Sequence, residues 1–238
     1  MTFPSTSDSL YPMSWKKEID ELAARRALAE KMGGEEKVAR QHSRGKMDAR
    51  ARLAGMVDAG SFREIGKIAG RGKYGPDGEL EDLAASNFIF GRANINGRPV
   101  VVSADDFTVR GGAADAALHR KFVQCEAMAH EYRLPLIRMI DGTGGGGSVK
   151  TLEDMGYTYI PHVPGWHEII ANLDTVPVVA LALGPTAGLG AARVVASHYS
   201  VMVRGLSQLF AAGPAVAAVI GDTLDREELG GTDVHTRN

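Results

Sequence analysis

The sequence predicts an α/β domain, because short apolar runs of strand character alternate with amphipathic segments of helical spacing. Two of these runs, 136–140 and 178–183, are each followed directly by a glycine-rich segment. An Asn96-Gly97 step joins two further strand-like runs, which is a strong hairpin signal. Together these features predict a sheet built with a repeating strand-strand-helix rhythm.

The chain divides into three parts. Residues 1–12 contain Pro4, Pro12 and several serines, and we expect a flexible lead. Residues 13–45 carry apolar side chains at helical spacing among many charges, which predicts an N-terminal helical extension, with Gly33-Gly34 dividing it into two helices. No linker interrupts residues 46–238, so this span is expected to be one domain.

Within that domain the patterns predict the elements in order. The expected helices are 46–57, 113–132, 166–173 and 214–220, and the expected strands are 62–68, 87–95, 99–104, 136–140, 178–183 and 199–203. Residues 70–85 are rich in glycine and charge and are expected to form a mobile connection.

Composition excludes several classes of protein. The 238 residues are 44% hydrophobic with a net charge of −2, which gives no electrostatic case for nucleic-acid binding. No apolar stretch approaches the length of a membrane span. The single cysteine, Cys125, excludes a disulfide framework and a multi-cysteine metal site, and its helix spacing with Phe122 and Ala129 predicts a buried core residue. These features favour the cytoplasm, or the mitochondrial matrix after removal of a transit peptide.

The two glycine-rich segments, 142–148 and 184–191, are the candidate functional site. A strand followed by a glycine turn can direct backbone N–H groups at one point, which suits an anion or a developing oxyanion. Ordinary loops remain the alternative. A phosphate-binding P-loop is disfavoured because Val149 precedes Lys150, and a dinucleotide motif because Arg193 stands where its third glycine is required.

The sequence resembles the carboxyltransferase (beta-type) subunit of biotin-dependent acyl-CoA carboxylases, of the propionyl-, methylcrotonyl- and acetyl-CoA carboxylase type, within the crotonase superfamily. The resemblance rests on matching segments in matching order: 45–52, 60–66, 106–112 with His119 and Lys121, 184–191, and 227–235. It implies a ClpP/crotonase-like fold of repeated β-β-α units for residues 46–238, corresponding to the N-terminal half of the family's subunit.

The resemblance also implies a mechanism. The α-carbon of an acyl-CoA attacks the carboxyl carbon of carboxybiotin, and backbone N–H groups stabilise the enolate oxygen without a metal. The oxyanion donors carried over are Gly144 and Gly145, with Gly188, Leu189 and Gly190 in the second turn. The substrate-binding positions carried over are Arg110, Gly111, Gly112, Lys121, Thr143, Gly146 and Ala187. His119 and His198 are candidate bases, but neither has a carboxylate at motif spacing, so they are expected to be structural or exposed.

Two features of the chain depart from the family. Asp141-Gly142-Thr143-Gly144 replaces the usual Asp-Ser-Gly-Gly, and Leu189 interrupts the second turn, where its N–H still provides a donor. Only the first of the family's two halves is present, so we expect the chain to be incomplete without the C-terminal half.

The implied partners are acyl-CoA, the C-terminal carboxyltransferase half, a biotin carboxylase and biotin carrier subunit or domain, and further copies of the chain; no nucleic acid, membrane or metal is expected. Two alternatives remain. One is a biotin-independent CoA thioester hydrolase or decarboxylase, and the other is a non-catalytic assembly domain that acts through its N-terminal helices.

Overall fold

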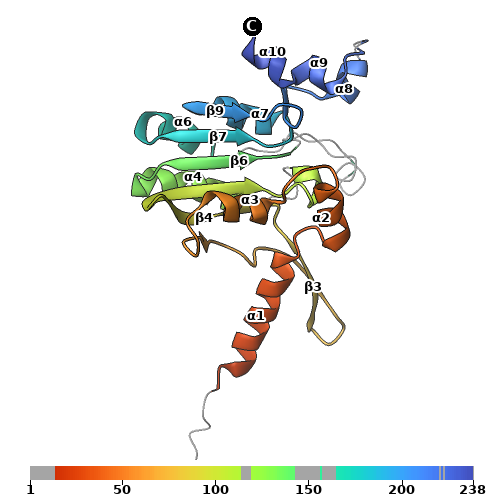
Figure 1. Ribbon diagram of the computed structural model, residues 1–238. Coiled ribbons are helices and arrows are strands. Elements are labelled where there is room, and N and C mark those ends of the chain that lie inside the picture. The colour runs from red at the N-terminus through yellow and green to blue at the C-terminus, as the bar shows by residue number, and fades with distance from the viewer. Residues whose placement is uncertain are drawn as a thin grey trace, which may run out of the picture.

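The computed structural model describes residues 14–113, 119–142, 156, 165–219, 221 and 223–237. Its centre is a six-stranded sheet in the order β1-β4-β5-β6-β7-β9 (Figure 1). These strands are Arg63–Glu64, Phe88–Ile95, Arg98–Asp105, Leu136–Ile140, Val178–Ala182 and Tyr199–Met202. Strands β5, β6, β7 and β9 run parallel, so their carboxyl ends meet at one edge of the sheet. The predicted α/β class is confirmed.

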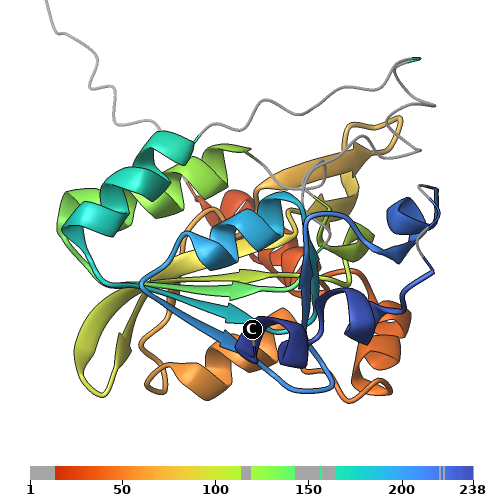
Figure 2. The same cartoon turned by 90° about the horizontal axis from the view of Figure 1, so that it is seen from above.

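Helices cover both faces of this sheet (Figure 2). Alternation along β5 sends Val100 and Val102 toward α3 (Ala49–Met56), and it sends Val101 to the opposite core, which includes residues of α4 (His119–Tyr132). Helix α6 (Trp166–Thr175) packs beside α4. Cys125 is fully buried in the α4 core, so its predicted packing role is confirmed.

The β4–β5 connection is the predicted hairpin. Asn96 and Gly97 both have positive φ, 50° and 76°, as a two-residue turn of this kind requires. The carboxylate of Asp58 accepts the N–H groups of both residues at 2.8 Å. This end of the sheet lies opposite the edge where the parallel strands finish.

The N-terminal extension contains α1 (Lys16–Glu30) and α2 (Glu35–His42), and the predicted break at Gly33-Gly34 is confirmed. A β-carbon on Gly33 would lie 2.2 Å from the carbonyl oxygen of Thr108, and the Gly33 N–H donates to Thr108 Oγ1 at 2.9 Å. This close contact docks α2 on the domain. Helix α1 extends away from the sheet (Figure 1).

The expectation of a mobile connection over 70–85 was wrong. Strands β2 (Gly70–Tyr74) and β3 (Leu80–Ala85) form an antiparallel pair, and Leu83 and Ala85 pack against Ala29 of α1. The sequence of this pair shows no clear strand alternation, since most of its residues are exposed and many of them are glycines or charged. Only β3 buries side chains, and it buries them against the N-terminal helix α1 rather than in the main core. The strand predicted at 62–68 is also shorter than expected, since only Arg63–Glu64 pair with β4.

The C-terminal part adds a second, two-stranded sheet that the sequence did not predict. Strand β8 (Pro185–Ala187) pairs in parallel with β10 (Gln208–Phe210). Helix α7 (Leu189–Val195) follows β8 and packs on β6 and β7. Helices α8 (Pro214–Val219), α9 (Arg226–Gly230) and α10 (Thr232–Thr236) lie on the opposite side of the molecule from α1 (Figure 1). No helix in the described part of the chain combines the length and apolarity needed to cross a membrane.

Candidate functional site

The described parts of the two glycine-rich segments meet at the carboxyl edge of the parallel strands. Asp141 and Gly142 follow β6, and Leu183 and Gly184 follow β7. The Leu183 N–H donates to the carbonyl of Ile140 at 2.8 Å, and the Ala187 N–H donates to the carbonyl of Gly142 at 3.3 Å. The Ala187–Gly142 bond therefore connects the two turns directly, and the Leu183–Ile140 bond connects the strand ends from which they begin.

A buried ion triad lies between these turns. Asp141, at 0% exposure, is 2.8 Å from Lys46 Nζ through Oδ1 and 2.8 Å from Arg52 Nη1 through Oδ2. Burial raises the pKa of Asp141 and lowers that of Lys46, whereas the opposite charges counteract both shifts. With two cations in contact, we expect the Asp141 carboxylate to be ionised at neutral pH.

Glycine is required where the turns approach one another. A β-carbon on Gly184 would lie 2.1 Å from Asp141 Oδ1, and one on Gly112 would lie 2.6 Å from the Asp141 carbonyl oxygen. Gly112 belongs to η1 (Arg110–Gly112), a short 3₁₀ turn after β5. Three chain segments thus converge on Asp141 with no room for side chains.

One of the three second-turn N–H groups implied by the resemblance is already hydrogen-bonded within the protein. The Gly188 N–H already donates to the carbonyls of Phe210 and Ala211, each at 3.2 Å. Leu189 and Gly190 form the first turn of α7, where a helix leaves its N–H groups without intrahelical partners. Leu189 and Gly190 therefore remain candidate donors, whereas the Gly188 N–H is engaged.

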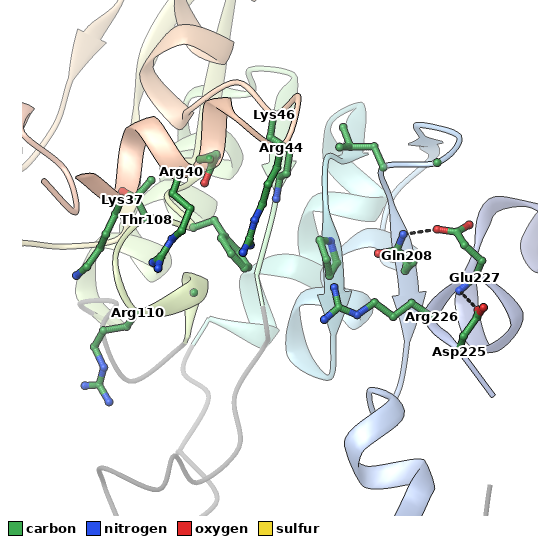
Figure 3. A pocket seen from close by; sticks show the side chains of 16 residues that line it. Lys37, Arg40, Arg44, Lys46, Thr108, Arg110, Gln208, Asp225, Arg226 and Glu227 are labelled. Atoms are coloured by element: carbon green, nitrogen blue, oxygen red, sulfur yellow. Dashed lines mark hydrogen bonds between the residues drawn. The ribbon is translucent and has the colours of Figure 1, made fainter. Parts of the chain in front are cut away.

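A cleft of about 740 Å³ borders the second glycine-rich segment through Pro185 and the ion triad through Lys46 (Figure 3). Its walls come from the α2 region, from the 107–111 segment and from the C-terminal segments around β10 and α9. Its basic lining residues are Lys37, Arg40, Arg44, Lys46, Arg110 and Arg226. In Figure 3, Arg226 extends from the α9 side toward the basic residues of α2.

This cleft has excess positive charge, although the whole chain carries a net charge of −2. Its two acidic residues are already engaged: Asp225 caps α9, and Glu227 accepts a hydrogen bond from Gln208. Among the described residues, no carboxylate pairs with Lys37, Arg40 or Arg44. The cleft is therefore suited to an anionic ligand.

Sequence reasoning missed this wall of the cleft. Lys37, Arg40 and Arg44 recur at i, i+3 and i+7, which places them on one face of a helix and its following turn. That spacing was the available signal. Residues 13–45 were predicted only as a helical extension, with a role in assembly under the alternative of a non-catalytic domain.

The predicted substrate-binding positions do not all lie at the cleft. Arg110 and Gly111 line the cleft, and Gly112 packs against Asp141 and Gly142. Ala187 bonds to Gly142, as described above. Thr143, Gly144, Gly145 and Gly146 lie outside the described residues.

Lys121, also predicted to bind substrate, lies outside the cleft lining. It is 5% exposed, its Nζ is 6.0 Å from the centre of the Phe90 ring, and its side chain runs beside Gly66. Burial lowers its pKa to about 8, against the attraction of Glu64. Lys121 is not among the cleft-lining residues, so the structure gives it no contact there.

His198 has a structural role, as expected. Its Nδ1 accepts the Val178 N–H at 3.0 Å, and its Nε2 lies 2.9 Å from the Leu173 carbonyl oxygen. The side chain of His119 is outside the described atoms. Within the described ranges no group of three or more histidine, cysteine or acidic residues is arranged to hold a metal ion.

The sequence of this chain is similar to that of several known proteins. The family described as "Carboxyl transferase domain" matches residues 40–238. The carboxyltransferase subunit of propionyl-CoA carboxylase from Haloferax mediterranei is 31% identical over 94% of this chain and 43% of its own length. Methylmalonyl-CoA decarboxylase subunit alpha from Veillonella parvula is 30% identical over 92% of this chain and 42% of its own.

Among solved structures, transcarboxylase 12S, a hexamer with methylmalonyl-coenzyme A and methylmalonic acid bound, superposes with a TM-score of 0.75 at 29% identity. It covers 93% of this chain and 42% of its own chain. The chain thus spans less than half the length of each of these relatives.

Proposed function

Because the chain belongs to the carboxyl transferase domain family and has its crotonase-like fold, we propose that it is the acyl-CoA-binding half of a biotin-dependent carboxyltransferase. It moves a carboxyl group between carboxybiotin and the α-carbon of an acyl-CoA. The partners are the C-terminal half, a biotin carboxylase and carrier, and further copies of the chain. The location is the cytoplasm or the mitochondrial matrix.

The observation that carries this proposal is the position of the basic cleft beside the glycine turns. Coenzyme A carries a pyrophosphate and a 3′-phosphate, and Lys37, Arg40 and Arg44 offer cations on one wall for them. Lys46 belongs to both the cleft lining and the ion triad at the first turn. A CoA bound in the cleft would therefore extend its thioester toward the turns.

The chemistry assigned to the turns is enolate stabilisation. The α-proton would pass to the ureido group of biotin, which has released its carboxyl group; negative charge would then develop on the thioester oxygen, and backbone N–H groups directed at it would lower the barrier. We assign the first turn's donors to Gly144 and Gly145, and those of the second turn to Leu189 and Gly190. Loss of one such donor costs about 2.7–4 kcal/mol of barrier.

Biotin is assigned to a separate carrier. The cationic lining of the cleft suits phosphates better than the neutral ureido ring of biotin, so we place the carboxybiotin site on the C-terminal half. When bound, carboxybiotin supplies the activated carboxyl group. The residues of this chain hold and orient the thioester and stabilise charge on its oxygen.

Decarboxylation of an acyl-CoA is the second candidate. It is favoured by the similarity to a subunit named for methylmalonyl-CoA decarboxylase. It uses the same enolate and the same N–H donors, since loss of the carboxyl group also leaves charge on the thioester oxygen. Product analysis with a carboxylated acyl-CoA, with and without a biotin carrier, separates the two reactions.

Calorimetric titration of the chain with CoA, 3′-dephospho-CoA and an acyl-CoA tests the proposal. We expect binding of CoA, weaker binding of dephospho-CoA, and little carboxyl transfer by this half alone. Arg40→Glu should weaken CoA binding at least about tenfold, because it reverses a charge in the wall of the cleft. Lys17→Glu makes the same charge change on exposed α1 and serves as the matched control.

Absence of CoA binding by folded chain would overturn the proposal, as would a folded Arg40→Glu variant that binds like wild type. The oxyanion assignment has its own test in an enzyme reconstituted with the C-terminal half. Gly145→Val should reduce turnover by about 10²-fold or more, since its side chain obstructs the thioester oxygen. A folded and fully active valine variant would remove Gly145 from the site.

A further inference from the structure

We infer that Lys46 and Arg52 are positioning residues that act through the carboxylate of Asp141 to hold the two glycine turns in fixed register. The inference about structure stands on the geometry around Asp141. Its catalytic consequence rests on the proposed function.

Arg52 contacts the ends of both β6 and β7. Its Nη1 pairs with Asp141 at the end of β6, and its Nη2 donates to the Leu183 carbonyl at 2.9 Å at the end of β7. One rigid guanidinium thus spans the two strand ends from which the glycine turns begin. A lysine at position 52 would keep the charge but could not reproduce this planar two-way contact.

The backbone packs tightly around Asp141. A β-carbon on Gly184 would lie 2.1 Å from Asp141 Oδ1 and 2.5 Å from Lys46 Nζ. The turn after β7 therefore packs directly on the ion pair, so a movement of the carboxylate toward Gly184 would displace that turn. Gly112 and Gly142 make a similarly close backbone contact on the other side.

Lys46 links the ion triad to the cleft. Lys46 lines the cleft, and its Nζ lies 4.4 Å from the centre of the Phe107 ring, which is also part of the lining. Lys46 is therefore the one member of the triad that contacts both the cleft and Asp141. Arg52 is not a lining residue, which allows positioning to be tested without altering the cleft.

The charge balance explains why the carboxylate is needed. Lys46 and Arg52 are both buried, and removing the charge of their common partner leaves two cations uncompensated. Asp141→Asn preserves the shape of the side chain while removing its charge. Its main effect should be separation of the two cations and loss of register between the turns.

Amide hydrogen exchange tests the inference independently of any activity. The reporters are the N–H groups of Leu183 and Ala187, because Leu183 donates to Ile140 where β6 and β7 end, and Ala187 donates to Gly142 in the first turn. Asp141→Asn and Arg52→Lys should each accelerate exchange at both reporters at least about tenfold. Exchange at Val101, whose N–H donates to Pro135 away from the turns, should change less than about twofold.

Asp58→Asn is the matched control, since Asp58 is also a carboxylate that holds loop structure. It should accelerate exchange at Asn96 and Gly97 and leave Leu183 and Ala187 unchanged. If Asp141→Asn does not fold, Arg52→Lys provides the same measurement. A folded variant of either kind with wild-type exchange at Leu183 and Ala187 would overturn the inference.

The catalytic consequence is measured with the reconstituted enzyme. Arg52→Lys should lower kcat by about 10- to 100-fold and change KM for the acyl-CoA by less than about threefold, because it misplaces the donors without altering the cleft. An increase in KM at unchanged kcat would contradict a positioning role. If wild-type enzyme neither binds nor turns over acyl-CoA, the proposed function fails, and the exchange measurement still decides the structural inference.

Discussion

Arg138 and Glu126 form a bidentate ion pair inside the protein, with Arg138 Nε 2.9 Å from Oε1 and Nη2 2.7 Å from Oε2 of Glu126. The two residues are 0% and 1% exposed. Asn172 Nδ2 of α6 also donates to Glu126 at 3.0 Å, and Arg138 Nη1 donates to the Ala196 carbonyl at the end of α7 at 2.7 Å. This pair therefore connects β6, α4, α6 and α7 in one network.

Removing only one partner of this pair should be severe. Glu126→Ala leaves a buried guanidinium without its carboxylate, and we expect a loss of about 3–5 kcal/mol in the free energy of unfolding. Urea denaturation followed by circular dichroism measures it. Asp20→Ala breaks the exposed Lys16–Asp20 pair and should cost less than about 1 kcal/mol. Equal losses in the two variants would show that burial of the network is unimportant.

Gly184→Ala should destabilise the protein by about 1–3 kcal/mol or more, because the added methyl overlaps Asp141 and Lys46 in a packed site. Gly55→Ala is the informative comparison. Gly55 lies in α3, and its β-carbon would meet only Met47 Cε at 3.8 Å. That change should stabilise the fold by about 0.5–1 kcal/mol through helix propensity. Thermal unfolding should therefore shift in opposite directions, and a stabilising effect of Gly184→Ala would refute the packing argument.

Lys121 should make stability depend on pH above neutrality. Its pKa falls from 10.5 to about 8 in the folded state, so below pH 8 the buried charge is retained at a cost on the order of 3 kcal/mol. Between about pH 8 and 10.5 the unfolded chain binds more protons than the folded one, so stability rises with pH through this range. Above about pH 10.5 Lys121 is neutral in both the folded and the unfolded state, so burying it no longer costs stability.

Lys121→Met removes this titration and should be more stable than wild type at pH 7, with the advantage shrinking by pH 10. Paired urea titrations at the two pH values measure the difference. A constant difference would contradict the lowered pKa. CoA titration of the same variant decides whether Lys121 belongs to the substrate site, since loss of binding by the folded variant would place it there.

The chain should self-associate through its C-terminal helices. Val216 and Val219 of α8 are 57% and 84% exposed, so this short helix presents two apolar side chains to solvent. Val219→Asp should shift sedimentation toward the monomer. Ile19→Asp, on exposed α1 at the opposite side of the molecule, should have a smaller effect. A clean wild-type monomer at all accessible concentrations would contradict this prediction.

Local sequence patterns determined much of the framework. The Asn96-Gly97 step predicted the hairpin, the apolar run over 99–104 predicted a strand, and the glycines after 136–140 and 178–183 indicated the edge where the candidate site lies. These features depend on residues within a few positions of one another, which is why they can be recognised without a structure. The order of longer motifs was enough to indicate the family.

The tertiary structure alone decided how distant segments combine. Lys46 and Asp141 are 95 residues apart, and the cleft joins cations of α2 to Arg226 near the C-terminus. Arg138 lies within the apolar run 136–140, and its partners lie on α4 and at the end of α7. Periodicity reports which face of an element is buried, but the partner of a buried charge depends on how the chain folds back on itself. That is the physical reason why the sequence located the glycine turns, whereas only the fold identified the ion triad that holds them together.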